Sequence, residues 1–162
     1  MGAIFSEDRK YRYTLYRDWP MADGEERQGC GHARACVMFI GLNPSTADEV
    51  NDDPTIRRCR GFAKSWGYGA MFMLNLFAFR ATDPLEMMKA VDPVGQDNDH
   101  WLVEHARSAT IVVAAWGRRG EYQQRDKAVL KLIGKIHQIG KAEYPRHPLY
   151  LKSNLLPIEV RP

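Results

Sequence analysis

The sequence predicts an α/β fold in which a mostly parallel sheet lies between helices. Short, uninterrupted apolar runs at 35–42, 70–79 and 110–116 are typical of strands that are buried on both faces. Segments with helical periodicity separate these runs, and such alternation of strands and helices is typical of parallel sheets. A length of 162 residues suits one domain with its own core, so we predict a single domain over residues 1–162.

The ends of the chain differ from this alternating region. Residues 11–19 are rich in β-forming side chains that alternate in polarity, which predicts a half-exposed strand. We expect this strand to lie at an edge of the sheet, antiparallel to residues 35–42. Residues 20–33 are rich in glycine and charge and predict a loop. Residues 154–162 are expected to form an irregular tail.

Helix signals occur between the apolar runs. Asp53 and Asp83 are each followed by proline, which is the pattern of an N-cap with proline at the first helical position. They predict a helix from about residue 54 to 66 and a short second one. Helical spacing of apolar residues predicts two more helices, over 98–108 and 122–136.

Composition excludes several classes of protein. No apolar run approaches the roughly 18 residues of a membrane span, and the first residues lack the pattern of a secretory signal. Three cysteines without such a signal predict a reducing, cytoplasmic location. Cys30 and His32 lie close together, but no second pair follows at zinc-ligand spacing, so we expect no metal and no cofactor.

Polar side chains occur where two of the expected strands end. Asn43, Ser45 and Thr46 follow the run at 35–42, and ligands bind beyond the carboxyl ends of strands in open α/β sheets. Asn75 stands inside the next run, where an amide without hydrogen-bond partners costs roughly 1–3 kcal/mol. This amide either bonds to a neighbouring loop or binds a ligand.

The net charge of +3 permits nucleic-acid binding without requiring it. The charge is uneven, because residues 118–146 hold eight basic and three acidic side chains, a local excess of five positive charges. This segment is the best candidate for a phosphate-facing surface, and a merely solvated helix is its competitor.

Three motifs fall at the ends of successive expected strands. They are Gly41-Leu-Asn43-Pro44-Ser45, Leu74-Asn75-Leu76 and His147-Pro148. Together with Ala115-Trp116-Gly117, and in this order, they resemble the motifs of the uracil-DNA glycosylase superfamily over roughly residues 35 to 152. The resemblance implies a three-layer sandwich with a central, mostly parallel four-stranded sheet, here with an added N-terminal antiparallel edge strand.

Over nearly its full length the chain also resembles an uncharacterised bacterial and phage family, domain of unknown function 1643. The segments that carry this resemblance are Gly41-Leu-Asn-Pro-Ser-Thr-Ala-Asp48, Asp53-Pro-Thr55, Asn75-Leu-Phe-Ala78 and Arg146-His-Pro-Leu-Tyr-Leu151. That family brings no assigned reaction.

The glycosylase resemblance implies roles for individual residues. Asn43 would hold a water for attack at the sugar carbon, and Asn75 would pair with the edge of an extruded base. His147 would donate a hydrogen bond to the base oxygen on which negative charge develops. Phe77 or Tyr68 would stack on the base. Phosphate would be contacted by Ser45, Thr46 and Arg57.

The chain departs from the glycosylase pattern at Ser45 and Thr46, where that pattern has glycine or an aromatic residue, and no aspartate precedes Pro44. Three hypotheses therefore stay open. The first is a hydrolase of N-glycosidic bonds in nucleic acid or a nucleotide. The second is a non-catalytic nucleic-acid-binding module, and the third is an enzyme acting on a small phosphorylated metabolite. No membrane partner is expected, and the sequence does not predict the oligomeric state.

Overall fold

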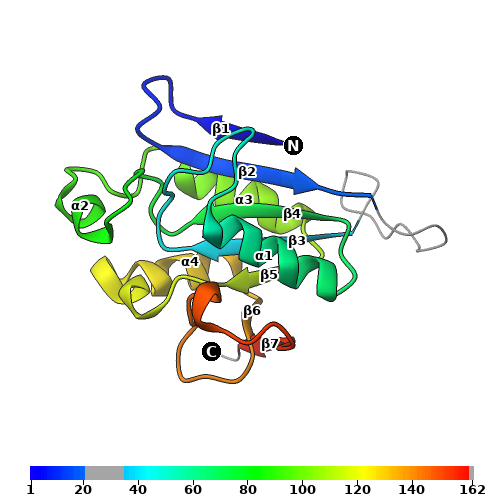
Figure 1. The fold of residues 1–162 in the computed structure, drawn as a ribbon. Helices are drawn as coiled ribbons and strands as arrows, with labels where there is room; N and C mark the ends of the chain where they lie inside the picture. The colour runs from blue at the N-terminus through cyan, green and yellow to red at the C-terminus, as the bar shows by residue number, and fades with distance from the viewer. Residues whose placement is uncertain (21–34, 161–162) are drawn as a thin grey trace.

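The structure is a computed structural model in which residues 1–20 and 35–160 are described. Most of the expected loop at 20–33, with Cys30 and His32, lies outside the described residues. Seven strands form one sheet in the order β1-β2-β4-β3-β5-β6-β7 (Figure 1). The strands are β1 (Gly2–Phe5), β2 (Arg12–Asp18), β3 (Cys36–Gly41), β4 (Ala70–Asn75), β5 (Ile111–Ala114), β6 (Ile136–Ile139) and β7 (Pro157–Val160).

The expectation of a three-layer sandwich around a mostly parallel four-stranded sheet is wrong. The sheet has seven strands and is mixed, since three of its pairings are parallel and three are antiparallel. Strand β2 pairs with β4 rather than with β3, and β1 lies outside β2, so β2 is not the edge. At the other side β7 adds an antiparallel strand to β6, within the expected irregular tail.

Helices pack on both faces of this sheet. They are α1 (Pro54–Ser65), α2 (Pro84–Lys89), α3 (Asn98–Ser108) and α4 (Arg125–Ile133), with 3₁₀ helices η1 (Arg118–Gln124) and η2 (Pro148–Tyr150). Helix α1 packs on one face through Ile56, Cys59 and Phe62, while α2, α3 and α4 contribute to a second apolar cluster on the other face (Figure 1). The core strands β3 and β4 are buried along their whole length.

The helix starts follow from the local sequence. Asp53 accepts a hydrogen bond from the Ile56 N–H at 2.9 Å, and Asp83 accepts one from the Leu85 N–H, so both predicted N-caps are confirmed. The predicted helix over 122–136 ends earlier than expected. Gly134, with a φ of 81°, ends α4, and the chain then enters β6.

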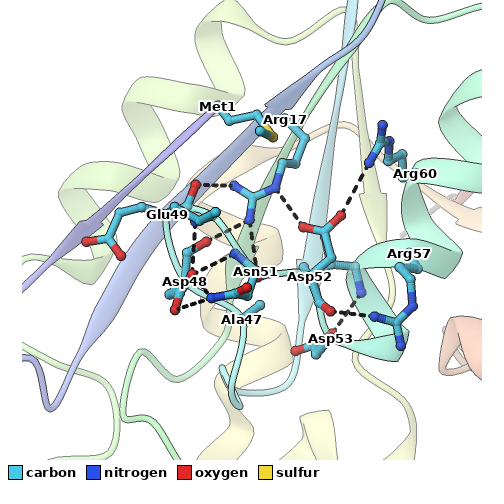
Figure 2. Close-up of polar contacts among 12 residues, drawn as sticks. Met1, Arg17, Ala47, Asp48, Glu49, Asn51, Asp52, Asp53, Arg57 and Arg60 are labelled. Carbon is cyan, nitrogen blue, oxygen red and sulfur yellow. Dashed lines mark hydrogen bonds and ion pairs between the residues drawn. The ribbon is translucent and has the colours of Figure 1, made fainter.

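A buried arginine anchors the loop between β3 and α1. The Arg17 side chain is fully buried, and its Nε lies 2.7 Å from a carboxylate oxygen of Asp52. Its remaining N–H groups donate to five backbone carbonyls, of which those of Asp48, Glu49 and Asn51 belong to this loop (Figure 2). Because a buried cation needs partners on all sides, Arg17 fixes the path of the loop that leads to Asp53.

No helix among the described residues is long and apolar enough to cross a membrane.

Removal of the carboxylate that pairs with Arg17 should destabilise the fold. Asp52→Ala leaves a buried cation uncompensated, so we expect a loss of about 3 kcal/mol in the free energy of unfolding, measured by urea denaturation. Glu86→Ala is the control, because it removes an exposed partner of Lys89 and should cost below about 0.5 kcal/mol. Equal losses in the two variants would contradict the anchoring role.

Candidate functional site

A cavity of about 480 Å³ opens where β3, β4 and β5 end. Gly41 and Asn75 end β3 and β4 and face each other in register, while Trp116 follows β5. The start of α1 and the 3₁₀ helix η2 complete the wall. Parallel pairing therefore brings together segments that lie far apart in the sequence.

Asn75 provides the most unusual polar group of the cavity wall. Its side chain is only 1% exposed, and neither Nδ2 nor Oδ1 has a hydrogen-bond partner among the described residues. A Cβ on Gly41 would lie 2.9 Å from this Oδ1 and 2.6 Å from Met73 Cε, so glycine is needed opposite the amide. The amide thus has no bond to a neighbouring loop, and its donor and acceptor are both left for a ligand.

Asn43 has a more constrained amide. Its Nδ2 donates to the carbonyl oxygens of Ala81 at 2.8 Å and Pro44 at 3.1 Å. These bonds tie the turn after β3 to the segment after β4. Since Nδ2 is occupied, Oδ1 is the atom of this side chain that can accept a hydrogen bond from a ligand or a water.

His147 is held as a hydrogen-bond donor. Its Nδ1 accepts a bond of 3.4 Å from the Leu149 N–H at the start of η2, which places the proton of the neutral ring on Nε2. Burial lowers the pKa of His147 below its ordinary value of 6.5, and the nearby charge of Asp53 opposes this by raising it. The ring is therefore neutral at pH 7 and can donate through Nε2–H.

The charged residues of the cavity wall are mostly basic. Arg12, Arg118 and Arg119 line it, and Asp53 is the one acidic side chain among the described residues of its wall. Two basic residues of the 118–146 segment thus border the cavity. Others of that segment are engaged elsewhere: Arg125 bonds to Asp99 and to the Leu76 carbonyl, and Lys135 pairs with Glu159.

The remaining residues singled out from the sequence lie at various distances from the cavity. Ser45 lines it, and its Oγ is 3.5 Å from Thr82 Oγ1. Thr46 and Arg57 are exposed and do not line it, and Arg57 donates to the Asp52 carbonyl. Phe77 is buried in the core against Tyr122, and Tyr68 precedes β4, at the opposite edge of the sheet.

Sequence reasoning missed other lining residues. Arg12 begins β2, and its place at the cavity follows from the antiparallel pairing of β2 with β4. Trp116 is an aromatic wall whose indole is held by η1, since a Cβ on Gly120 would lie 2.1 Å from Trp116 Cδ1. Tyr150 is 77% exposed at the cavity and offers a ring for stacking, whereas Trp116 is 4% exposed and belongs to the core. The sequence did contain a signal for the two aromatic residues, because Trp116 and Tyr150 lie within or next to the motifs at the strand ends.

Within the described part of the chain, no three His, Cys, Asp or Glu side chains are grouped so that they could hold a metal ion.

Comparison with known proteins gives one family. The model of a family described as "Protein of unknown function (DUF1643)" matches residues 12–149. No curated protein and no solved structure matches the chain. The resemblance to uracil-DNA glycosylases therefore finds no support in these comparisons, while the family match includes Arg12, Asn43, Asn75 and His147.

The pKa of His147 can be measured by NMR titration of its ring protons. We expect a value below 6.5 and a further decrease in Asp53→Asn, which keeps the N-cap of α1 but removes the charge that raises this pKa. Because the unfolded chain protonates first, stability should fall as the pH drops from about 7 through the folded-state pKa. His147→Asn should lose this part of the pH dependence, and a wild-type value above 6.5 would contradict the buried, neutral ring.

Proposed function

We propose that this chain, which belongs to the DUF1643 family of proteins of unknown function, binds a nucleobase of a nucleotide or nucleic acid and hydrolyses its N-glycosidic bond. The observation that carries the proposal is the Asn75 amide, which is buried at the cavity, where neither polar atom has a hydrogen-bond partner in the described part of the chain. Such an orphaned amide costs the fold roughly 1–3 kcal/mol for each atom, and a ligand that satisfies it recovers this cost.

A nucleobase matches the chemistry of that amide. Asparagine presents one donor and one acceptor side by side, and the HN–C=O edge of uracil or hypoxanthine presents the complementary pair. The cavity volume of about 480 Å³ is within the usual range for small-molecule sites. Tyr150 supplies an exposed aromatic ring on which a planar base can stack, and Trp116 lines the same cavity.

The other polar groups fit the cleavage of the bond between sugar and base. In that step the water oxygen forms a bond to the sugar carbon, the carbon–nitrogen bond breaks, and its electron pair leaves with the base. The water keeps one hydrogen as the new sugar hydroxyl, and its other proton is finally taken up by the released base, which is then neutral. His147 Nε2–H stabilises the negative charge on a base oxygen, and a neutral donor needs no proton loss to do so. Asn43 Oδ1 accepts a hydrogen bond from the water, and the carboxylate of Asp53 lines the same cavity.

The bonds of Asn43 favour a second candidate function. Its Nδ2 braces two loops, and an amide oxygen is a weak base, so the residue serves equally well as a structural element of a site that binds without cleaving. In that case the protein is a non-catalytic nucleic-acid-binding module. The remaining alternative is an enzyme that uses the same pocket for a small phosphorylated metabolite.

Incubation with oligonucleotides that contain uracil, hypoxanthine or a thymine mismatch tests the reaction, with single- and double-stranded forms and free mononucleotides side by side. Wild type should release free base, and His147→Ala should be slower by roughly 100-fold, as when one stabilising donor is lost. Asn43→Ala should also be slower. Release of base that is unchanged in both variants would overturn the roles assigned to Asn43 and His147. If wild type binds these substrates but releases no base, the binding module is the function that fits.

Asn75→Leu separates base recognition from folding. It removes both orphaned polar atoms, so we expect unchanged or higher stability in urea denaturation. Base binding should weaken by roughly 10- to 100-fold, as for the loss of one bidentate pair, measured by calorimetry. Tight binding that survives this change would contradict the role of the amide.

Gly41→Ala tests the position of the Asn75 amide while Asn75 itself is kept. The added methyl group would displace Asn75 Oδ1 or Met73 Cε, because both lie under 3.0 Å from the place that its carbon would take. We expect weaker base binding with a folded protein, measured in the same calorimetric experiment. Gly61→Ala is the control, since a Cβ there meets no atom within 4 Å.

A further inference from the structure

Strand β2 carries two buried arginines with opposite surroundings. Arg17 is fully buried and has the Asp52 carboxylate and five carbonyl oxygens as partners (Figure 2). Arg12 is 1% exposed, yet its side chain makes one hydrogen bond among the described residues, from Nη1 to the Ala47 carbonyl at 2.9 Å. Its Nε is buried without a partner, and no salt bridge joins it to a described carboxylate.

The buried guanidinium of Arg12 stays charged, and its desolvation costs folding free energy. Burial lowers the pKa of Arg12 to about 10, so the guanidinium is still protonated at neutral pH. A desolvated cation that makes no salt bridge opposes folding. The contrast with Arg17 indicates that the fold can satisfy an arginine on this strand and leaves Arg12 unsatisfied.

The two arginines also differ in what they face. Arg12 lines the cavity, whereas Arg17 does not. Arg118 and Arg119, which are exposed, line the cavity as well, and only Asp53 opposes these three charges among the lining residues. The cavity wall therefore carries two net positive charges. The charge of Arg12 is desolvated and makes no salt bridge with a described carboxylate, although the nearby charge of Asp53 partly opposes the fall of its pKa. Such an arrangement attracts an anion with several oxygen acceptors.

We propose that Arg12, with Arg118 and Arg119, forms a subsite for the phosphate monoester of a mononucleotide whose base reaches Asn75. The subsite deepens the function proposed above and rests on its base-binding part. A terminal phosphate carries close to two negative charges at pH 7, and these balance the net charge of the wall. It also offers three oxygens to guanidinium groups, which bind phosphate through paired N–H donors.

The burial of Arg12 favours a mononucleotide over a nucleic-acid chain. Arg12 is 1% exposed and lines the cavity, so an anion that contacts its guanidinium must enter the cavity. A terminal phosphate can be enclosed there. An internal phosphodiester carries one charge, and its chain must leave the site in two directions.

Calorimetric titration tests the subsite with inorganic phosphate, deoxyuridine, deoxyinosine and the 5′-monophosphates of both nucleosides. We expect wild type to bind inorganic phosphate, and to bind at least one monophosphate about tenfold or more tighter than its nucleoside. Arg12→Met should abolish the binding of inorganic phosphate and the difference between monophosphate and nucleoside. Arg107→Gln is the matched control, because it removes an exposed arginine of α3 that does not line the cavity and should leave both unchanged.

The stability of Arg12→Met distinguishes a binding role from a structural one. Replacement of this buried cation by an apolar side chain removes a desolvation cost and also one hydrogen bond, to the Ala47 carbonyl. Because these effects oppose each other, the melting temperature of the free protein should change little, whereas a structural salt bridge would be lost at a large cost. Arg118→Gln with Arg119→Gln, both exposed, gives a second test that does not depend on the core, and should weaken phosphate binding. Retained phosphate binding in both the Met variant and this double variant would overturn the subsite.

The outcomes also separate the subsite from the proposed function. Nucleoside binding that depends on Asn75, with no gain from phosphate, would overturn the subsite alone. Binding of inorganic phosphate that depends on Arg12, without Asn75-dependent binding of any base, would overturn the proposed function alone. An oligonucleotide with an internal deoxyuridine and no terminal phosphate that binds as tightly as the monophosphate would overturn the choice of a monoester.

Discussion

The parallel pairing of β3 with both β4 and β5 is the constraint on which the candidate site depends. Strands that run in the same direction end at the same edge of a sheet, so Gly41, Asn75 and the residues after Ala114 meet there without being close in sequence. The register is equally important. Gly41 is paired with Asn75, and its missing side chain leaves the space that the buried amide occupies. A slip by one residue would turn Asn75 to the other face of the sheet.

The loop between β3 and α1 converts this edge into a cavity, and it is held from several sides. The amide of Asn43 joins it to Ala81, Arg12 donates to the Ala47 carbonyl, and Arg17 binds the carbonyls around Asp48. Within the loop, hydrogen bonds from the N–H groups of Asn51 and Val50 lower the pKa of Asp48 to about 2. A loop fixed by so many bonds orders its polar groups before a ligand arrives, which lowers the entropy lost on binding.

Periodicity and capping were sufficient to predict the central elements. The apolar runs that became β3, β4 and β5 are buried on both faces, and an aspartate followed by proline marks the starts of α1 and α2. The strand-end motifs also placed Asn43, Asn75 and His147 near one another, and all three line one cavity.

The rest of the fold depends on pairings that no local pattern encodes. The outer strands β1 and β7 are four residues long and only partly buried, so they give no clear apolar signal. Alternation in β2 suggested a half-exposed edge, but β1 and β4 flank that strand on both sides. For this reason the seven-stranded mixed sheet was missed, and so was Arg12, whose position at the cavity needs the β2–β4 pair.

Unsatisfied polar groups are the physical link between this fold and a ligand. Other buried atoms without partners occur among the described residues, including Arg60 Nε and Asn98 Oδ1, but each of those side chains makes another bond. Asn75 is different, because both polar atoms of its amide lack a partner. Arg12 adds a buried cation without a salt bridge to a described residue, at the same cavity.

The Asn75 amide and the Arg12 cation each reduce the stability of the fold, and both lie at one cavity. A single ligand that binds there would explain both. If Asn75 and Arg12 were only structural, apolar residues of similar size would fill their places with less loss of free energy. Arg17, on the same strand as Arg12, has a carboxylate and five carbonyls, so the surrounding loops are able to satisfy a buried arginine. A ligand with a base edge at one end and an anionic group at the other would satisfy both residues at once, and local rules of folding are commonly broken where a site requires it.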